Sequence, residues 1–480
     1  MDKQQQNTPL FNRLKQFTQD QPLSFHVPGH KNGLIFPKEG RRYFNDILRL
    51  DLTELTGLDD LHAPNDVIAE AQCLARDWFR SDYSYFLVNG STVGNLAMIL
   101  ATCNRGEKVI VQRNSHKSIL NGLELSGARP VFVSPEFDQQ VKRYTAPSIE
   151  QLKQAIHNHP DAKAIILTYP DYFGHTSDIK SVINTAHQYK IPVLVDEAHG
   201  VHFSIDAKVF PMSALELGAD LVIQSAHKMA PAMTMTAFLH IKSSYIPSEK
   251  IEHYLQMLQS SSPSYPLMAS LDLARYFLAM QTKENIQLTL NSIEQMRHVF
   301  SKSNKWDLIP IQKERDDPLK ITLNAKPGYS AHSIAALFES EGVFPEMRTE
   351  KQILFIHGLK FFDDWKRLEK VVEKVTRQLK FSSKHATIES KQPIFPEVTT
   401  VLAYSYGEME PKEIIFMKWS QIIGKVAAEA ITPYPPGIPI VVKGERITEH
   451  HIKVIHYLLE QQINFQQDNI QEGMRVFKGE

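Results

Sequence analysis

A regular alternation of short apolar runs with longer amphipathic segments constrains the fold of this chain more than any other feature. Six runs rich in β-branched and aromatic residues have the length of β-strands: 85–88, 108–112, 130–134, 164–168, 192–196 and 220–224. Segments between them, at 91–103, 148–159 and 178–190, place apolar residues at helical spacing. This alternation predicts an α/β fold with a mostly parallel sheet and helices on both faces. Ligands of such sheets bind at the carboxyl ends of the strands, so the residues just after each run matter most.

The alternation of strand-like and helical segments changes after about residue 300, where a smaller α/β domain is expected. The segments that carry this second pattern are 319–325, 330–342, 352–358 and 363–380. A polar stretch that ends in proline, 382–393, is the best candidate for a linker. The expected parts are an N-terminal arm with a large domain over 1–300, a small α/β domain over 301–385 and a C-terminal domain over 394–480.

Composition excludes several classes of protein. The 480 residues include 53 Lys and Arg against 54 Asp and Glu, so no excess of positive charge would draw the chain to nucleic acid or an anionic membrane. Two cysteines, Cys73 and Cys103, form neither a disulfide framework nor a zinc motif. His199 and His202 follow a strand end without an evident third ligand, so no metal site is expected. No signal peptide or membrane span is evident, which favours a cytoplasmic protein.

Three of the predicted strands are followed by residues that could bind a ligand or take part in catalysis. Gly90, Ser91 and Thr92 open a helix after the first strand, which is a pattern that suits an anion. Asp196 ends the run 192–196, and Lys228 follows the run 220–224. An anion cradle, a carboxylate and a lysine are therefore expected in one crevice.

Each of these features alone has a simpler explanation. A Gly-Ser-Thr sequence can be an ordinary capped helix, an aspartate after a strand is usually a turn residue, and a lysine is usually solvated. Lys228, however, precedes the apolar stretch 229–233. The three features together, in this order, favour a functional site.

Seven motifs between residues 25 and 439 narrow the interpretation further. They are FHVPGHKNG (25–33), LDDLHAP (58–64), NGSTVGN (89–95), RNSHKS (113–118), VDEAHGVH (195–202), SAHK (225–228) and YPPGIP (434–439). The chain thereby resembles the Orn/Lys/Arg decarboxylases, which are fold-type I enzymes that depend on pyridoxal 5'-phosphate (PLP). The similarity is to the compact form without a receiver-like N-terminal domain, and it implies an aspartate aminotransferase-like large domain.

The resemblance implies roles for individual residues. Lys228 would be the Schiff-base lysine and Asp196 would face the pyridine nitrogen. His116 would lie on the cofactor ring and Ala198 would pack against its opposite face. An alternative for His116 is a helix cap beside Ser115.

The same resemblance implies a cradle for the cofactor phosphate. The residues that would form it are Gly90, Ser91, Thr92, Ser225 and His227. His26 and His30, which bracket the PGH turn, either help to close the site or serve only the turn.

The implied reaction is decarboxylation of arginine, lysine or ornithine to CO2 and an amine related to polyamines, by a homodimer or larger homo-oligomer. A basic substrate needs an acidic partner at its far end. Glu346, in an apolar turn, is the first candidate, although it could instead pair with Arg348. Asp171 is the second candidate, in the turn 170–174 where relatives usually carry Pro-Thr-Tyr-x-Gly. Because the receiver-like module is missing, a decamer is not expected.

Two other functions remain open at this point. The fold-level residues alone do not select the chemistry, so an aminotransferase is an alternative, with Arg348 holding the substrate carboxylate. A non-catalytic PLP-binding regulator is another, although the sequence contains no DNA-binding helix-turn-helix segment or basic arm.

Overall fold

The computed structural model describes residues 3–382, 394–395, 397–434, 438–460 and 463–478. Nearly all of the predicted linker, and the middle of the motif at 434–439, lie outside these residues. The chain forms two compact units: unit 1 comprises Met1–Thr102 and Ile179–Thr282, and unit 2 comprises Cys103–Asp178 and Lys283–Glu480. The three-part division expected from the sequence stays a prediction.

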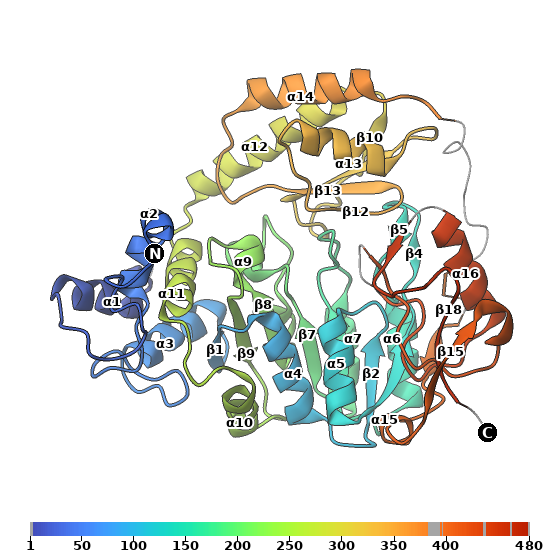
Figure 1. The fold of residues 1–480 in the computed structure, drawn as a ribbon, viewed down its shortest axis with the longest axis horizontal. Helices are drawn as coiled ribbons and strands as arrows, with labels where there is room; N and C mark the ends of the chain where they lie inside the picture. Colours follow the sequence, from blue (N-terminus) through green and yellow to red (C-terminus); the bar gives the residue numbers. More distant parts are fainter. Residues whose placement is uncertain (1–2, 383–393, 396, 435–437, 461–462, 479–480) are drawn as a thin grey trace. The chain divides into compact units, whose positions relative to one another are not determined.

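Unit 1 contains four neighbouring strands in the order β1-β9-β8-β7 (Figure 1). Their bounds are β1 Tyr83–Leu87, β7 Val193–Asp196, β8 Leu221–Ser225 and β9 Ala237–Ile241. β7 is parallel to β8, whereas β9 is antiparallel to both β8 and β1. β1, β7 and β8 therefore run in the same direction, and their carboxyl ends lie at one edge of the sheet.

Helices pack on these strands because β7, β8 and β9 are buried on both faces. The helices of unit 1 are α1 Pro9–Gln19, α2 Lys38–Leu50, α3 Val67–Phe79, α4 Gly90–Thr102, α7 Ile179–Gln188, α8 Ala214–Leu217, α9 Ala226–Met229, α10 Ser248–Leu258 and α11 Tyr265–Ala279. α4 packs on β8 and β9 through an apolar face that includes Val93, Ala97 and Met98. This packing places the first turn of α4 beside the carboxyl end of β8.

A buried ion pair anchors the beginning of the chain to α11. Arg275 donates from Nη2 to Asp272 Oδ1 at 2.6 Å and from Nη1 to the carbonyl of Gln5 at 2.6 Å. Both charged side chains are fully buried. Because an unpaired buried charge is costly, these contacts favour one position for the N-terminal segment.

Unit 2 contains a second set of neighbouring strands in the order β6-β2-β3-β14. Their bounds are β2 Lys108–Gln112, β3 Arg129–Val133, β6 Ile165–Thr168 and β14 Thr399–Val401. β6, β2 and β3 are parallel, and β14 adds an antiparallel edge. The helices of this segment are α5 Lys117–Ser126 and α6 Ile149–Asn158, and a hairpin joins β4 Phe137–Asp138 to β5 Arg143–Tyr144.

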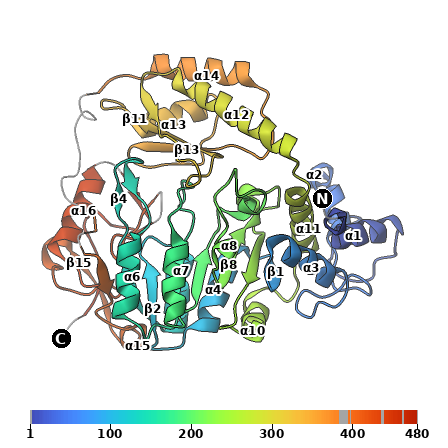
Figure 2. The same ribbon diagram turned by 180° about the vertical axis from the view of Figure 1, so that it is seen from behind.

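A separate antiparallel sheet of unit 2 has the order β10-β11-β13-β12 and packs against helices (Figure 2). Its elements are α12 Lys283–Ser301, β10 Trp306–Leu308, β11 Lys320–Ala325, α13 Ala331–Ser340, β12 Met347–Arg348, β13 Gln352–Ile356 and α14 Trp365–Gln378. The elements that follow are α15 Tyr406–Met409, β15 Ile414–Lys418, β16 Pro433–Tyr434, α16 Glu449–Glu460, β17 Asn464–Phe465 and β18 Gly473–Phe477.

A second buried ion pair holds the C-terminal segment of unit 2 to the end of β2. Arg113 donates from Nη1 and Nη2 to the two carboxylate oxygens of Glu445 at 2.8 and 2.7 Å. Burial by itself would raise the pKa of Glu445, but the guanidinium of Arg113 holds it below the ordinary value. The pair is thus charged, and its bidentate geometry gives the contact a defined register.

The six predicted strands and the helices between them are confirmed, with ends that differ by one or two residues. β9 and β14 were not predicted from the sequence, and both are antiparallel to their neighbours. None of the helices in the described part of the chain is both long and apolar enough to cross a membrane.

Candidate active site

Unit 1 brings together the residues predicted at three strand ends. Gly90 begins α4 just after β1, Asp196 is the last residue of β7, and Lys228 lies in α9 directly after β8. Leu87 of β1 and Ser225 of β8 are both paired with Ala237 on β9. The first turn of α4 and the start of α9 therefore lie on either side of one short strand.

The start of α4 has the features of an anion cradle. Gly90 has a φ of +79°, which favours glycine, and its N–H donates to the carbonyl of Met235 at 2.7 Å. Ser225 Oγ donates to Ser91 Oγ at 2.8 Å, and Thr92 is exposed. The first turn of a 13-residue helix also presents N–H groups that have no partner within the helix. This donor set fits a phosphate.

Asp196 is buried and its carboxylate has two hydrogen-bond donors. Asn95 Nδ2 donates to Oδ2 at 2.9 Å, and the N–H of Ala198 donates to Oδ1 at 3.2 Å. These two donors hold the carboxylate in one orientation. A buried carboxylate can in turn keep a pyridine nitrogen protonated.

Asn95 was not predicted as a site residue, although it ends the motif NGSTVGN (89–95). The available signal was a polar side chain inside an otherwise apolar helix, one turn after Ser91. Asn95 is 101 positions from Asp196 in the chain, so their contact depends on the fold.

Lys228 lies next to His199, which was considered from the sequence only as a metal ligand. Its Nζ is 3.2 Å from Nε2 of His199, and His199 is buried. Since an ammonium ion can only donate, this ring nitrogen accepts whenever Lys228 is charged. The neighbouring His227 donates from Nδ1 to the carbonyl of Thr236 at 3.0 Å. An amine, a carboxylate and an anion cradle at one edge fit the aldehyde, pyridine and phosphate groups of PLP.

His116 belongs to unit 2, where it is the N-cap of α5. Its Nδ1 accepts from the N–H of Ser118 at 3.3 Å and lies 2.9 Å from Ser118 Oγ. The helix-capping alternative is therefore present in the structure. A role for the exposed ring against the cofactor stays a prediction, as do the other predicted roles of site residues.

Asp171 also belongs to unit 2 and already has several partners. Arg143 Nη2 donates to Oδ2 at 3.3 Å, while the N–H groups of Phe173 and His175 donate to Oδ1 at 2.9 and 2.8 Å. The guanidinium of Arg143 also stacks on the Phe173 ring at 4.3 Å. These contacts satisfy the Asp171 carboxylate within the protein, which weakens it as a candidate for substrate binding.

Glu346 is exposed and has a different partner from the one considered in the sequence analysis. The hydroxyl of Tyr172 donates to Glu346 Oε1 at 3.1 Å, and the N–H of Glu346 donates to the carbonyl of Leu354 at 2.9 Å. Within the described residues, the side chain that contacts the Glu346 carboxylate is Tyr172 rather than Arg348. The carboxylate therefore keeps one oxygen available to a cationic ligand.

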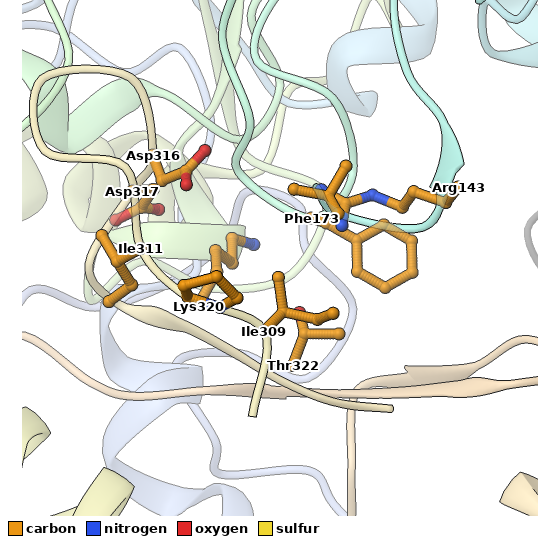
Figure 3. Close-up of a pocket in the computed structure, with 10 residues that line it drawn as sticks. Arg143, Phe173, Ile309, Ile311, Asp316, Asp317, Lys320 and Thr322 are labelled. Carbon is orange, nitrogen blue, oxygen red and sulfur yellow. The ribbon is translucent and has the colours of Figure 1, made fainter. Parts of the chain in front are cut away.

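A small cavity of unit 2 borders Arg143 and Phe173 (Figure 3). Its other walls include Asp316, Asp317 and Lys320, and its volume is about 20 Å³. This volume suits one water molecule and is far below that of an amino acid. The cavity is therefore not assigned to substrate. Within the described residues, no group of three or more His, Cys, Asp or Glu side chains is arranged to hold a metal ion.

Comparisons with known proteins identify the family. The family model described as Orn/Lys/Arg decarboxylase, major domain, matches residues 8–316, and the model of the C-terminal domain of this family matches residues 385–467. The chain belongs to the Orn/Lys/Arg decarboxylase family. The arginine decarboxylase of Bacillus subtilis (strain 168) is 33% identical, over 99% of this chain and 98% of the relative. The uncharacterized protein YaaO of the same organism is 40% identical over 96% of each chain.

Solved structures confirm the predicted fold class. The constitutive lysine decarboxylase of Escherichia coli superposes with a TM-score of 0.81 at 18% identity and covers 98% of this chain and 82% of that one. A serine palmitoyltransferase from Sphingomonas wittichii gives a TM-score of 0.52 at 14% identity, over 74% of this chain and 85% of that one. The decarboxylase family uses PLP, and the donor set of unit 1 fits this cofactor.

Proposed function

We propose that this PLP-dependent decarboxylase of basic amino acids acts on arginine, releasing CO2 and agmatine. The observation that carries the proposal is the pattern of identity among relatives. Four relatives named arginine decarboxylase are 32% to 34% identical over at least 94% of the chain. Three relatives named lysine decarboxylase are 20% to 23% identical. Arginine is therefore preferred to lysine and ornithine as the proposed substrate.

The residues of unit 1 have distinct tasks in this reaction. Bound PLP supplies an electron sink for the pair left behind when the bond from Cα to the carboxylate breaks. Lys228 would hold the cofactor through Nζ and would exchange it for the amino group of the substrate. Asp196 would pair with the pyridine nitrogen, and this pairing would strengthen the electron sink. Ser91, Thr92 and Ser225 bind the phosphate.

Three further residues complete the proposed site. His199 exchanges a proton with Lys228 at Nε2, because the two nitrogens are already within hydrogen-bond distance. The roles that the resemblance implies for His116 and Ala198 are also part of the proposal: each would pack against the cofactor ring and help to exclude water.

The substrate test is a screen of arginine, lysine and ornithine with purified enzyme and added PLP. Arginine should give the highest kcat/KM, with equal amounts of CO2 and agmatine and no keto acid. Release of CO2 from lysine with a higher kcat/KM than from arginine would contradict the proposed substrate. Production of a keto acid would indicate transamination instead.

The proposed selectivity residue is Glu346, supported by Tyr172. A carboxylate with an available oxygen suits a guanidinium, which presents parallel N–H donors. Tyr172 packs against a small apolar cluster with Phe173, Met347 and Leu354, so its hydroxyl is held in place. The hydrogen bond from Tyr172 thereby orients Glu346 and leaves the other oxygen for the substrate.

Glu346→Gln should raise KM for arginine about tenfold or more, since a charge-assisted hydrogen bond becomes a neutral one. Steady-state kinetics would measure the change, and borohydride labelling would confirm that Lys228 still binds PLP. Glu339→Gln, which alters an exposed carboxylate on α13, is the matched control and should leave KM unchanged. An unchanged KM in Glu346→Gln would exclude this residue.

A cytoplasmic homodimer that supplies polyamine synthesis is the proposed setting. Agmatine is a polyamine precursor, and two free cysteines suit a reducing compartment. The segment 23–44 supports self-association because its large apolar side chains are exposed. They are Leu23, Phe25, Val27, Leu34, Ile35, Tyr43 and Phe44. Apolar side chains gathered in this way usually mark an interface.

Phe25→Asp should weaken the dimer, because Phe25 is 93% exposed within one chain and a charge would oppose its burial in an interface. Sedimentation velocity over a range of concentrations would measure dissociation. Leu125→Asp, at an exposed apolar residue of α5, is the control and should leave the dimer intact. A wild-type enzyme that is active as a monomer would contradict the proposed homodimer.

A further inference from the structure

A line of buried polar side chains crosses the four strands of unit 1. Ser84 on β1, His240 on β9, Gln224 on β8 and Glu197 at the end of β7 have exposed fractions of 4%, 0%, 0% and 0%. Ser84 is directly opposite His240 in the strand register, and Gln224 lies two residues beyond the partner of His240 on β8. A complete line of this kind in an apolar sheet is costly unless every member is satisfied.

The hydrogen bonds of this line are continuous. Ser84 Oγ is 2.7 Å from His240 Nδ1, and His240 Nε2 is 3.1 Å from Gln224 Oε1. Gln224 Nε2 donates to Glu197 Oε2 at 2.6 Å. The N–H of Ala214, at the start of α8, donates to the other carboxylate oxygen of Glu197 at 2.7 Å.

The line can be satisfied in two directions. In one, Ser84 donates to His240, His240 to Gln224, and Gln224 to an ionised Glu197. If the Gln224 amide is rotated by 180°, every hydrogen bond runs the other way. A protonated Glu197 then donates to Gln224, Gln224 donates to His240, and His240 donates to the Ser84 oxygen. The reversed line keeps all four side chains neutral.

The surroundings of Glu197 favour the neutral line. Burial, with a smaller contribution from the nearby Glu216, raises its pKa to about 8, although the hydrogen bonds from Gln224 and Ala214 act in the opposite direction. Glu216 is itself paired with Arg80 at 3.2 Å, so that cation is already engaged. Burial lowers the pKa of His240 to about 3, which keeps the imidazole neutral.

Glu197 also belongs to the turn that carries the site. Strand alternation directs Asp196 and Glu197 to opposite faces of the sheet. The N–H of Glu197 donates to the carbonyl of Ile223 at 2.8 Å, and the N–H of Gly200 donates to the carbonyl of Glu197 at 2.9 Å. A Cβ at Gly200 would lie 2.6 Å from Glu197 Cγ, so the turn is tightly packed against this side chain.

We propose that Glu197 is a positioning residue: as a neutral acid joined to Gln224 and Ala214, it fixes the turn 197–200 and so the placement of Asp196 and His199. Ala198 and His199 lie within this turn, and they contact Asp196 and Lys228 respectively. The inference rests on the proposed roles of Lys228 and Asp196 in holding PLP. It adds a residue on the opposite face of the sheet that touches neither substrate nor cofactor.

The first test compares Glu197→Ala with Glu197→Gln in the full-length enzyme. Glutamine can accept from Ala214 and donate to Gln224, as the neutral acid does, whereas alanine can do neither. Glu197→Ala should raise the Kd for PLP and lower kcat by about tenfold or more each, and alter the visible circular dichroism of the bound cofactor. Glu197→Gln should restore Kd and the dichroism to within about threefold of wild type.

Asp220→Asn is the matched control. Asp220 is a buried carboxylate just before β8, at its opposite end, and it accepts from Val193, His187 and Ser243. This variant should lose thermal stability without changing the visible dichroism. The inference would be overturned if Glu197→Ala kept the Kd for PLP and the visible dichroism of the wild type. It would also be overturned if the alanine and glutamine variants lost PLP affinity and kcat to the same extent.

The second test uses the apoenzyme and remains informative if Glu197→Ala does not fold. The unfolded chain loses the Glu197 proton near its ordinary pKa of 4.5, whereas the folded chain keeps it to about 8. Stability should therefore fall as pH rises between these values and be constant above them. Glu197→Gln should lack this part of the decline in Tm. An identical decline in both proteins would overturn the neutral state of Glu197.

The two proposals fail in different ways. If the wild-type enzyme binds no PLP, the proposed function fails. If the wild-type enzyme binds PLP and the Glu197 variants have the same Kd and dichroism, only this inference fails.

Discussion

The burial of the Asp196 carboxylate is the constraint on which the rest of the site depends. An ionised carboxylate away from water is costly unless donors and a cation compensate it. Asn95 and the N–H of Ala198 supply the donors. A protonated pyridine nitrogen would supply the cation, which explains why a group that destabilises the fold by itself is useful in an enzyme that binds PLP.

The strand directions in unit 1 explain why the site residues lie at one edge of the sheet. Because β1, β7 and β8 run in the same direction, the anion cradle, Asp196 and Lys228 meet at one edge. The antiparallel strand β9 is what separates β1 from β8, and its residue Ala237 is paired with both. β9 also carries His240. The same strand therefore separates the two strand ends that form the site and connects Ser84 to Gln224 through hydrogen bonds.

The strands could be predicted from the sequence because their length and composition are local properties. A run such as 192–196 has strand length and composition by itself, and Asp196 follows directly from it. The direction of β9 could not be obtained in this way, since strand direction depends on pairing with distant segments. Partners of buried polar groups are equally non-local: Asn95 meets Asp196 across 101 positions, and Ser84 meets His240 across 156. The resemblance to a family supplied roles for residues, but it did not indicate Asn95, Gln224 or His240.

The central claim is that Lys228 binds PLP in unit 1. It is tested most directly by reducing the holoenzyme with borohydride and mapping the labelled peptide by mass spectrometry. The pyridoxyl group should be found on Lys228, and Lys228→Ala should neither incorporate the label nor release CO2 from arginine. A pyridoxyl group on another lysine, or full activity in Lys228→Ala, would contradict the claim.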